Sequence, residues 1–138
     1  MRTYFFLLVF VFTFSSNAFP QDNLAAYKRG KTLIGYGNYA EAMELMRPYM
    51  EESKYGRLAF YAQYHFGKAA FQNKQGELAK SVIKPLADNK AWEKQDEAKY
   101  LLALIYFEES KNIEALQELS LIKNPEIFAL GERASLKY

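Results

Sequence analysis

Beyond residue 20, the apolar residues follow the period of an α-helix. They recur at intervals of three and four, as at Leu24, Tyr27 and Ile34. No long stretch alternates with a period of two, as a half-buried β-strand does. The pattern predicts an all-α chain with seven helices: Leu24–Tyr36, Tyr39–Glu51, Tyr55–Asn73, Gly76–Ala87, Trp92–Ser110, Ile113–Ile122 and Pro125–Leu136.

Residues that favour helix ends stand at these boundaries. Four asparagines are candidate N-caps: Asn23, Asn38, Asn112 and Asn124. Glu41 follows Asn38 by three residues, as in a capping box. Gly37 can end the first helix in the left-handed conformation. Pro48 and Pro85 each remove one backbone hydrogen bond, so we expect their helices to kink or end there.

The same residue types return along the chain at spacings of 37 and 36 residues. Small residues lie on three of the helices, at Gly30, Gly67 and Ala103. Twelve residues after each of them comes an alanine, at Ala42, Ala79 and Ala115. A tyrosine precedes each small residue by three positions, at Tyr27, Tyr64 and Tyr100. Because small side chains let two helices approach closely, we interpret each unit as a pair of helices packed at these positions.

This arrangement resembles the tetratricopeptide repeat, a helix–turn–helix unit of 34 residues. The first unit carries the resemblance best, at Gly30, Gly37-Asn38-Tyr39 and Ala42. The second unit departs from it, with Lys74 and Gly76 where the turn's glycine and tyrosine are expected. The resemblance extends from Asn23 to Asn124. It implies a helix-turn-helix solenoid of about three divergent units, with Pro125–Leu136 as a C-terminal capping helix.

Residues 1–18 have the three regions of a secretory signal peptide. Arg2 forms the positive region, Tyr4–Phe14 is an apolar region of eleven residues, and Ser16 and Ala18 are the small residues before a cleavage site. Eleven helical residues span about 16 Å, short of the ~30 Å hydrocarbon core, so cleavage after Ala18 is favoured over an uncleaved anchor. We therefore expect residues 19–138 to form one exported domain, periplasmic or envelope-associated, without stable membrane insertion.

Composition excludes several kinds of chemistry. The chain has 138 residues, no cysteine and a net charge of +2. Without cysteine there is no disulfide, no zinc–thiolate or iron–sulfur site and no cysteine nucleophile. The near balance of charge gives no basis for nucleic-acid binding. His65 is the only histidine, and we expect a structural or surface role for it. The sequence therefore predicts no enzyme activity, no metal and no cofactor.

The resemblance implies that the first helix of each unit lines a concave face. The predicted groove there consists of Tyr27, Lys31, Ile34, Tyr64, Lys68, Phe71, Tyr100 and Phe107. Aromatic side chains with a few cations suit an extended peptide or a partner's helix. The alternative is that the tyrosines pack between adjacent units, with their hydroxyls reaching solvent. For Trp92 we expect a core or inter-unit anchor, with an exposed ligand-stacking role as the alternative.

Family members that grip a C-terminal carboxylate do so with paired Lys/Asn and Lys/Arg residues. The matching positions here hold Tyr27, Lys31, His65, Glu97 and Leu101. This clamp is mostly absent, which argues against recognition of chaperone tails.

The expected function is that of a non-catalytic scaffold that binds a protein or peptide. One alternative is the N-terminal repeat segment of a larger envelope protein, such as a penicillin-binding-protein activator. The apolar final helix Pro125–Leu136 and the abrupt end at Ser135-Leu136-Lys137-Tyr138 favour it, and they suggest association through that helix. A further alternative, an envelope enzyme accessory, lacks any catalytic constellation.

Overall fold

A computed structural model describes residues 21–129 of the chain. This part confirms the all-α class, since it contains helices and no strand: α1 Gln21–Gly35, α2 Tyr39–Met46, the 3-10 helix η1 Arg47–Tyr49, α3 Glu52–Tyr55, α4 Arg57–Gln72, α5 Gly76–Asp88, α6 Gln95–Glu108 and α7 Asn112–Ser120. A further helical turn at 126–129 ends the described part. The predicted signal peptide, and all but the start of the predicted helix Pro125–Leu136, lie outside it.

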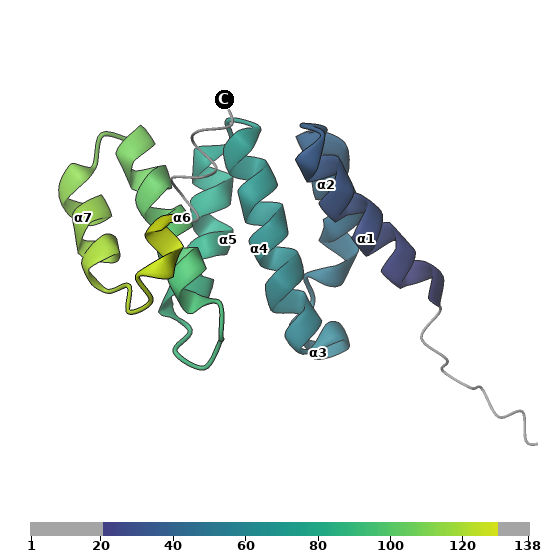
Figure 1. The fold of residues 1–138 in the computed structure, drawn as a ribbon. Helices are drawn as coiled ribbons and strands as arrows, with labels where there is room; N and C mark the ends of the chain where they lie inside the picture. The colour runs from purple at the N-terminus through teal and green to yellow at the C-terminus, as the bar shows by residue number, and fades with distance from the viewer. Residues whose placement is uncertain (1–20, 130–138) are drawn as a thin grey trace, which may run out of the picture.

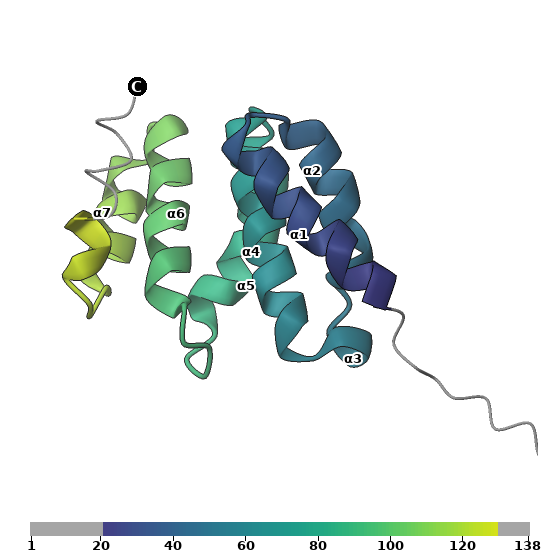
Figure 2. The same cartoon turned by 45° about the vertical axis from the view of Figure 1, so that its right-hand side comes forward.

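The long helices stand in a row, from α1 and α2 at one end to α7 at the other (Figure 1). Each of them packs mainly against its neighbours along the chain, giving the contacts α1–α2, α2–α4, α4–α5, α5–α6 and α6–α7. Smaller contacts join α1 to α4 and α4 to α6. The turn 126–129 lies beside α6 and α7 in both views (Figures 1 and 2). The described part is therefore three successive helix pairs: α1/α2, α4/α5 and α6/α7.

The two proline positions behave differently. The helix predicted to run from Tyr39 to Glu51 ends at Met46 as an α-helix and continues as η1, which contains Pro48. The short helix α3 that follows was not predicted. By contrast, α5 runs through Pro85 and ends three residues later, at Asp88. Of the two expected effects, an end at Pro85 is not found, because losing one backbone hydrogen bond close to a helix terminus removes little of the helix. The predicted bounds Gly76–Ala87 agree with α5 to within one residue.

The predicted N-caps are only partly confirmed. Asn124 accepts a hydrogen bond from the Glu126 amide at 3.0 Å, as a cap should. Asn38 occupies the cap position of α2, but its side chain makes no capping hydrogen bond. The capping box is absent because the Glu41 carboxylate bonds to Arg29 on α1 instead, at 2.7 Å.

Two other cap predictions are wrong. Asn23 lies inside α1, which begins two residues earlier. Asn112 is the first residue of α7, and Lys111 before it is the cap. Lys111 takes this position because its amide closes the preceding turn with a hydrogen bond to Tyr106 O at 2.9 Å.

One turn geometry occurs three times. The second residue after the first helix of each pair is left-handed: Gly37 at φ 79°, Lys74 at φ 62° and Ser110 at φ 61°. The amide of the next residue then bonds to the carbonyl five positions back at 2.9 Å, in Asn38–Leu33, Gln75–Ala70 and Lys111–Tyr106. This is the Schellman arrangement that closes helix C-termini. Gly37 was predicted from its residue type, whereas Lys74 and Ser110 occupy the same conformation without a glycine.

The six small residues singled out from the sequence are all buried. A Cβ placed on Gly30 would lie 2.9 Å from Met46 Cε, and one on Gly67 would lie 2.5 Å from Ile83 Cδ1. The alanines at 42, 79, 103 and 115 have no exposed surface. Close approach of the helices in each pair therefore depends on these small side chains.

Candidate functional site

The helices α1 and α4 enclose a shallow depression of about 290 Å³, which is closed at one end by the start of α2. Its lining consists of Lys31, Ile34, Gly35, Tyr39, His65, Lys68 and Gln72. Three of the eight predicted groove residues meet here: Lys31, Ile34 and Lys68. We call this site the α1–α4 depression.

The α1–α4 depression is cationic. Both of its lysines are exposed, and no aspartate or glutamate contributes to its lining. Among residues 21–129, neither Lys31 nor Lys68 has an acidic partner within ion-pair distance, whereas Arg29, also on α1, pairs with Glu41 at 2.7 Å. The site therefore holds two positive charges that are balanced only by solvent.

His65 forms part of the wall of the depression. Its imidazole lies between two phenol rings, with centroid distances of 6.2 Å to Tyr27 and 5.7 Å to Tyr64. Burial lowers the pKa of His65 to about 4, and the positive charges of Lys31 and Lys68 lower it further in the same direction. The imidazole is therefore neutral at neutral pH and available as a hydrogen-bond donor or acceptor.

The tyrosines of the predicted groove lie between consecutive helix pairs. Tyr27 is 7% exposed and packs edge-on against Tyr49, with ring centroids 5.6 Å apart. Tyr100 packs against Phe128 at 6.2 Å. Burial, with a smaller contribution from the charge of Glu97, raises the pKa of Tyr64 to about 12. None of these three rings lines the α1–α4 depression.

The remaining two residues of the predicted groove lie nearer the ends of their helices. Phe71 is half-buried near the end of α4, and Phe107 is 40% exposed near the end of α6. Neither lines the depression. The structure thus brings Lys31, Ile34 and Lys68 together in one depression. The aromatic residues of the predicted groove lie outside it.

A second set of aromatic residues shares the repeat spacing, which was not recognised in the sequence, although Trp92 was predicted to be an anchor. Tyr55, Trp92 and Phe128 follow the same spacings of 37 and 36 residues. Trp92 is 3% exposed and contacts the rings of Phe60, Tyr61 and Tyr64. Phe128 contacts Tyr100, and Tyr55 packs against Tyr49 at 5.2 Å. Trp92 is therefore a buried anchor between helix pairs. Each residue of this set follows a tyrosine of the repeat by 28 positions, so a longer repeat alignment would have identified Tyr55, Trp92 and Phe128 together.

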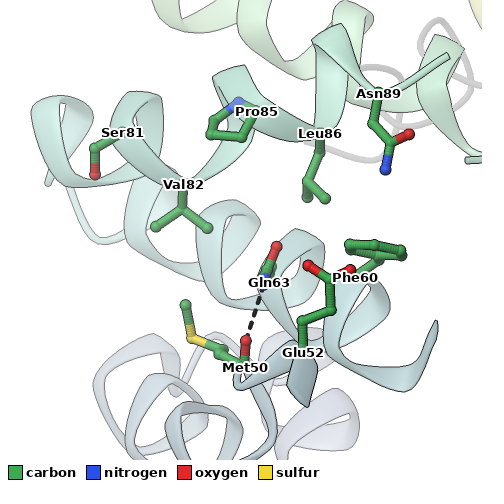
Figure 3. Close-up of a pocket in the computed structure, with 9 residues that line it drawn as sticks. All are labelled: Met50, Glu52, Phe60, Gln63, Ser81, Val82, Pro85, Leu86 and Asn89. Carbon is green, nitrogen blue, oxygen red and sulfur yellow. Dashed lines mark hydrogen bonds between the residues drawn. The ribbon is translucent and has the colours of Figure 1, made fainter. Parts of the chain in front are cut away.

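A larger cavity of about 500 Å³ opens between α5 and the segment after η1 (Figure 3). Val82, Pro85 and Leu86 form one wall, and Phe60 and Gln63 of α4 lie below them in the view. Gln63 Nε2 donates a hydrogen bond to Met50 O at 2.8 Å, which fixes the opposite wall. The cavity is mostly apolar and can admit an apolar side chain, but nothing in its lining suggests bond-making chemistry.

Two acidic residues with low pKa values have structural explanations. Glu109 accepts hydrogen bonds from Lys111 and Lys80, which together hold its pKa at about 2. Glu93 receives hydrogen bonds from Tyr61 and Arg57, and its pKa is likewise about 2. Each carboxylate joins one helix pair to the next, so these shifts reflect packing between pairs and not an acid–base centre.

Residues 21–129 contain no group of three or more histidine, cysteine, aspartate or glutamate side chains that could hold a metal ion. Among their helices, none is both long enough and apolar enough to cross a bilayer. No family model matches the chain, and neither the curated proteins nor the solved structures provide a match.

Proposed function

We propose that this chain is a non-catalytic scaffold for protein–protein interaction, built from three divergent tetratricopeptide-like units and a C-terminal capping helix. In this proposal its partner is a peptide or helix that lies across α1, α4 and α6, the first helices of the three pairs. Export to the periplasm or envelope, with cleavage after Ala18, belongs to the same proposal because of the signal-like residues 1–18.

The observation that carries the proposal is the threefold turn. Left-handed residues at 37, 74 and 110 share one hydrogen-bond pattern at the spacing of the sequence repeat. Repetition of this kind is typical of arrays whose units contact only their neighbours and present one extended surface. On that surface the α1–α4 depression provides two lysines without acidic partners among the described residues, which favours a binding role over a purely structural one.

A second candidate function is that of a segment within a larger envelope assembly. Ile113 and Leu116 on α7 are 72% and 59% exposed in the described part of the chain. Met43, which matches Leu116 in the repeat alignment, is only 5% exposed on α2, which packs against α4. An apolar helix face of this kind suits a covering element, either further chain or a partner.

The test is a charge reversal that leaves the core untouched. Lys31→Glu/Lys68→Glu alters the depression, and Lys28→Glu/Lys90→Glu makes the same change in charge at exposed residues outside it. We expect partners cross-linked to the wild type in an envelope fraction to be retained by the second variant and lost by the first. Equal retention by both variants, with unchanged helical circular dichroism, would contradict binding at this face.

Tyr64 is a poor choice for this experiment, although the sequence suggested it. Its ring packs against Trp92 and His65. Truncation there would alter the packing between helix pairs, so a lost partner could not be assigned to the binding surface.

A further inference from the structure

We propose that the α1–α4 depression binds an acidic side chain of the partner, with its carboxylate held between the ammonium groups of Lys31 and Lys68. The inference rests on the proposed function and specifies it further. The partner segment carries an aspartate or glutamate where it crosses the first two helix pairs.

Charge complementarity is the first argument. Nine of the lysine and arginine residues in the described part have an acidic partner within 4.0 Å: Arg29, Arg47, Arg57, Lys74, Lys80, Lys84, Lys94, Lys99 and Lys111. Six described lysines are not among them: Lys28, Lys31, Lys54, Lys68, Lys90 and Lys123. Of these, Lys31 and Lys68 share a depression whose lining contains no acidic residue, whereas Asp88 lies in the lining that Lys90 and Lys123 share. Two cations that share a site repel each other, and a carboxylate between them removes this repulsion and forms charge-assisted hydrogen bonds.

The size and lining of the depression are the second argument. A volume of about 290 Å³ is ample for one aspartate or glutamate side chain. Gly35 leaves open space beside the lysines, since a Cβ added there would meet no atom within 4 Å. Tyr39 and Gln72 add a hydroxyl and an amide to the lining. These are hydrogen-bond donors for the carboxylate oxygens, while Ile34 can contact the methylene groups of the same side chain.

His65 is the third argument and supplies an independent measurement. The groups that face it are Lys31 and Tyr27 from α1, Lys68 and Tyr64 from α4, and Tyr39 from the start of α2. None of them is a carboxylate. A carboxylate bound to the two lysines would offset the charges that depress the pKa of the imidazole, so the pKa of His65 should rise when an acidic segment binds.

The third helix pair lacks the corresponding lysine, which indicates where along the partner the acidic residue lies. In the repeat alignment, Leu104 on α6 matches Lys31 and Lys68. No lysine or arginine therefore stands at this position of the third helix pair. The acidic side chain consequently belongs over the first two pairs, with apolar residues of the partner toward Phe107, which is 40% exposed.

The experiment compares immobilised pools of amidated hexapeptides that are identical except at one central position. That position carries Glu, Gln or Lys, and the other positions are drawn from Leu, Phe, Val, Tyr and Ala. Binding of the purified full chain is measured for the wild type, for Lys31→Gln/Lys68→Gln and for the matched control Lys28→Gln/Lys90→Gln. The imidazole signals of His65 are followed by NMR in a parallel titration with each pool in solution.

We expect the wild type and the matched control to bind the Glu pool at least about tenfold more tightly than the Gln pool, and the Lys pool least. We expect Lys31→Gln/Lys68→Gln to lose this preference, and the pKa of His65 to rise only with the Glu pool. Equal binding of Glu and Gln pools overturns the carboxylate site but leaves the scaffold proposal intact. A Glu preference that survives in Lys31→Gln/Lys68→Gln also overturns it, and no binding of any pool contradicts both proposals.

Discussion

The indole of Trp92 packs against the phenol ring of Tyr64, with their centroids 5.9 Å apart. Tyr64 belongs to α4, whereas Trp92 lies in the loop between α5 and α6. The contact therefore ties the second helix pair to the start of the third. Trp92 also contacts Phe60 and Tyr61, so its side chain packs against three aromatic rings of α4.

Replacing Trp92 by alanine should lower the free energy of unfolding by about 3–5 kcal/mol, because it empties this buried contact. Trp92→Phe should cost distinctly less, since the indole Nε1 is buried without a hydrogen-bond partner and its loss leaves nothing unsatisfied. Urea denaturation followed by circular dichroism measures both. Equal losses for the two variants would contradict the account of Trp92 as a packing residue.

Gly67→Ala should destabilise the chain by about 1–3 kcal/mol, because the new Cβ would lie 2.5 Å from Ile83 Cδ1 and 2.6 Å from its Cγ1. Gly76→Ala is the matched control. Gly76 has no atom within 4 Å of an added Cβ and sits at the first position of α5. Thermal unfolding should separate the two variants, and a neutral Gly67→Ala would mean that α4 and α5 are less closely packed than described.

Ser110→Gly should stabilise the chain by about 1 kcal/mol, because the serine is held at φ 61°, where a Cβ is unfavourable. Lys74→Gly should do the same, since the ion pair it loses, 3.7 Å to Glu108, is mostly exposed and contributes little. Gly37→Ala, at φ 79°, should destabilise by a similar amount. As a control, Asn73→Gly at φ −82° should give no gain. Denaturant titration measures these changes: Ser110→Gly should raise the unfolding midpoint, and Gly37→Ala should lower it.

The pKa of His65 is about 4 in the folded chain, because of burial and then the charges of Lys31 and Lys68. In the unfolded chain it should be near the ordinary value of about 6.5. Between these pH values the unfolded state binds more protons, so stability decreases as the pH falls from 6.5 to 4, by an amount on the order of 2–3 kcal/mol.

His65→Gln should remove most of this decrease, which denaturant titrations of both proteins at pH 7, 5.5 and 4 would measure. Glu93 and Glu109, with folded pKa values of about 2, also contribute to the decrease near pH 4, because their carboxylates take up protons in the unfolded chain first. They do so equally in both proteins, so the difference between the two pH profiles reports His65 alone. An NMR titration that finds the His65 pKa above 6 would contradict the buried position of the imidazole.

Export can be checked directly at the N-terminus. When the full chain is expressed in a bacterial host, we expect a secreted or periplasmic product whose first residue is Phe19. Ala18→Asp should block this cleavage, because the enzyme requires a small residue before the cut. N-terminal sequencing and intact mass report the outcome, and a product that retains residues 1–18 in wild type would favour an anchor.

Helix positions were the most predictable feature, because the apolar period is visible in the residues themselves. Tyr39, Gly76 and Ala42 could be assigned to their helices from sequence alone. Competition between possible hydrogen-bond partners of one side chain was harder to predict. Glu41 satisfies the rule for a capping box, yet Arg29 twelve residues earlier binds its carboxylate, and only the packing of α1 on α2 brings the two together.

The sequence correctly placed Lys31 and Lys68 in the candidate site, but it wrongly placed the aromatic residues there. Lys31 and Lys68 have polar ends that must reach solvent, so their position on a helix face decides their exposure. A tyrosine can serve either a groove or a packed interface, and its repeat position does not distinguish the two. Tyr27 and Tyr64 became packing residues because Tyr49 and Trp92 lie within reach of their rings.

Packing between successive helices also determines how the chain can fold. Because α1 contacts α2, α2 contacts α4, and so on to α7, most contacts join residues close together in sequence. Few loops must close before native contacts form, which is the condition for rapid folding. Cooperativity between distant pairs then depends on a few bridging side chains such as Trp92, and hydrogen exchange should begin at the ends of the row and reach α4 and α5 last.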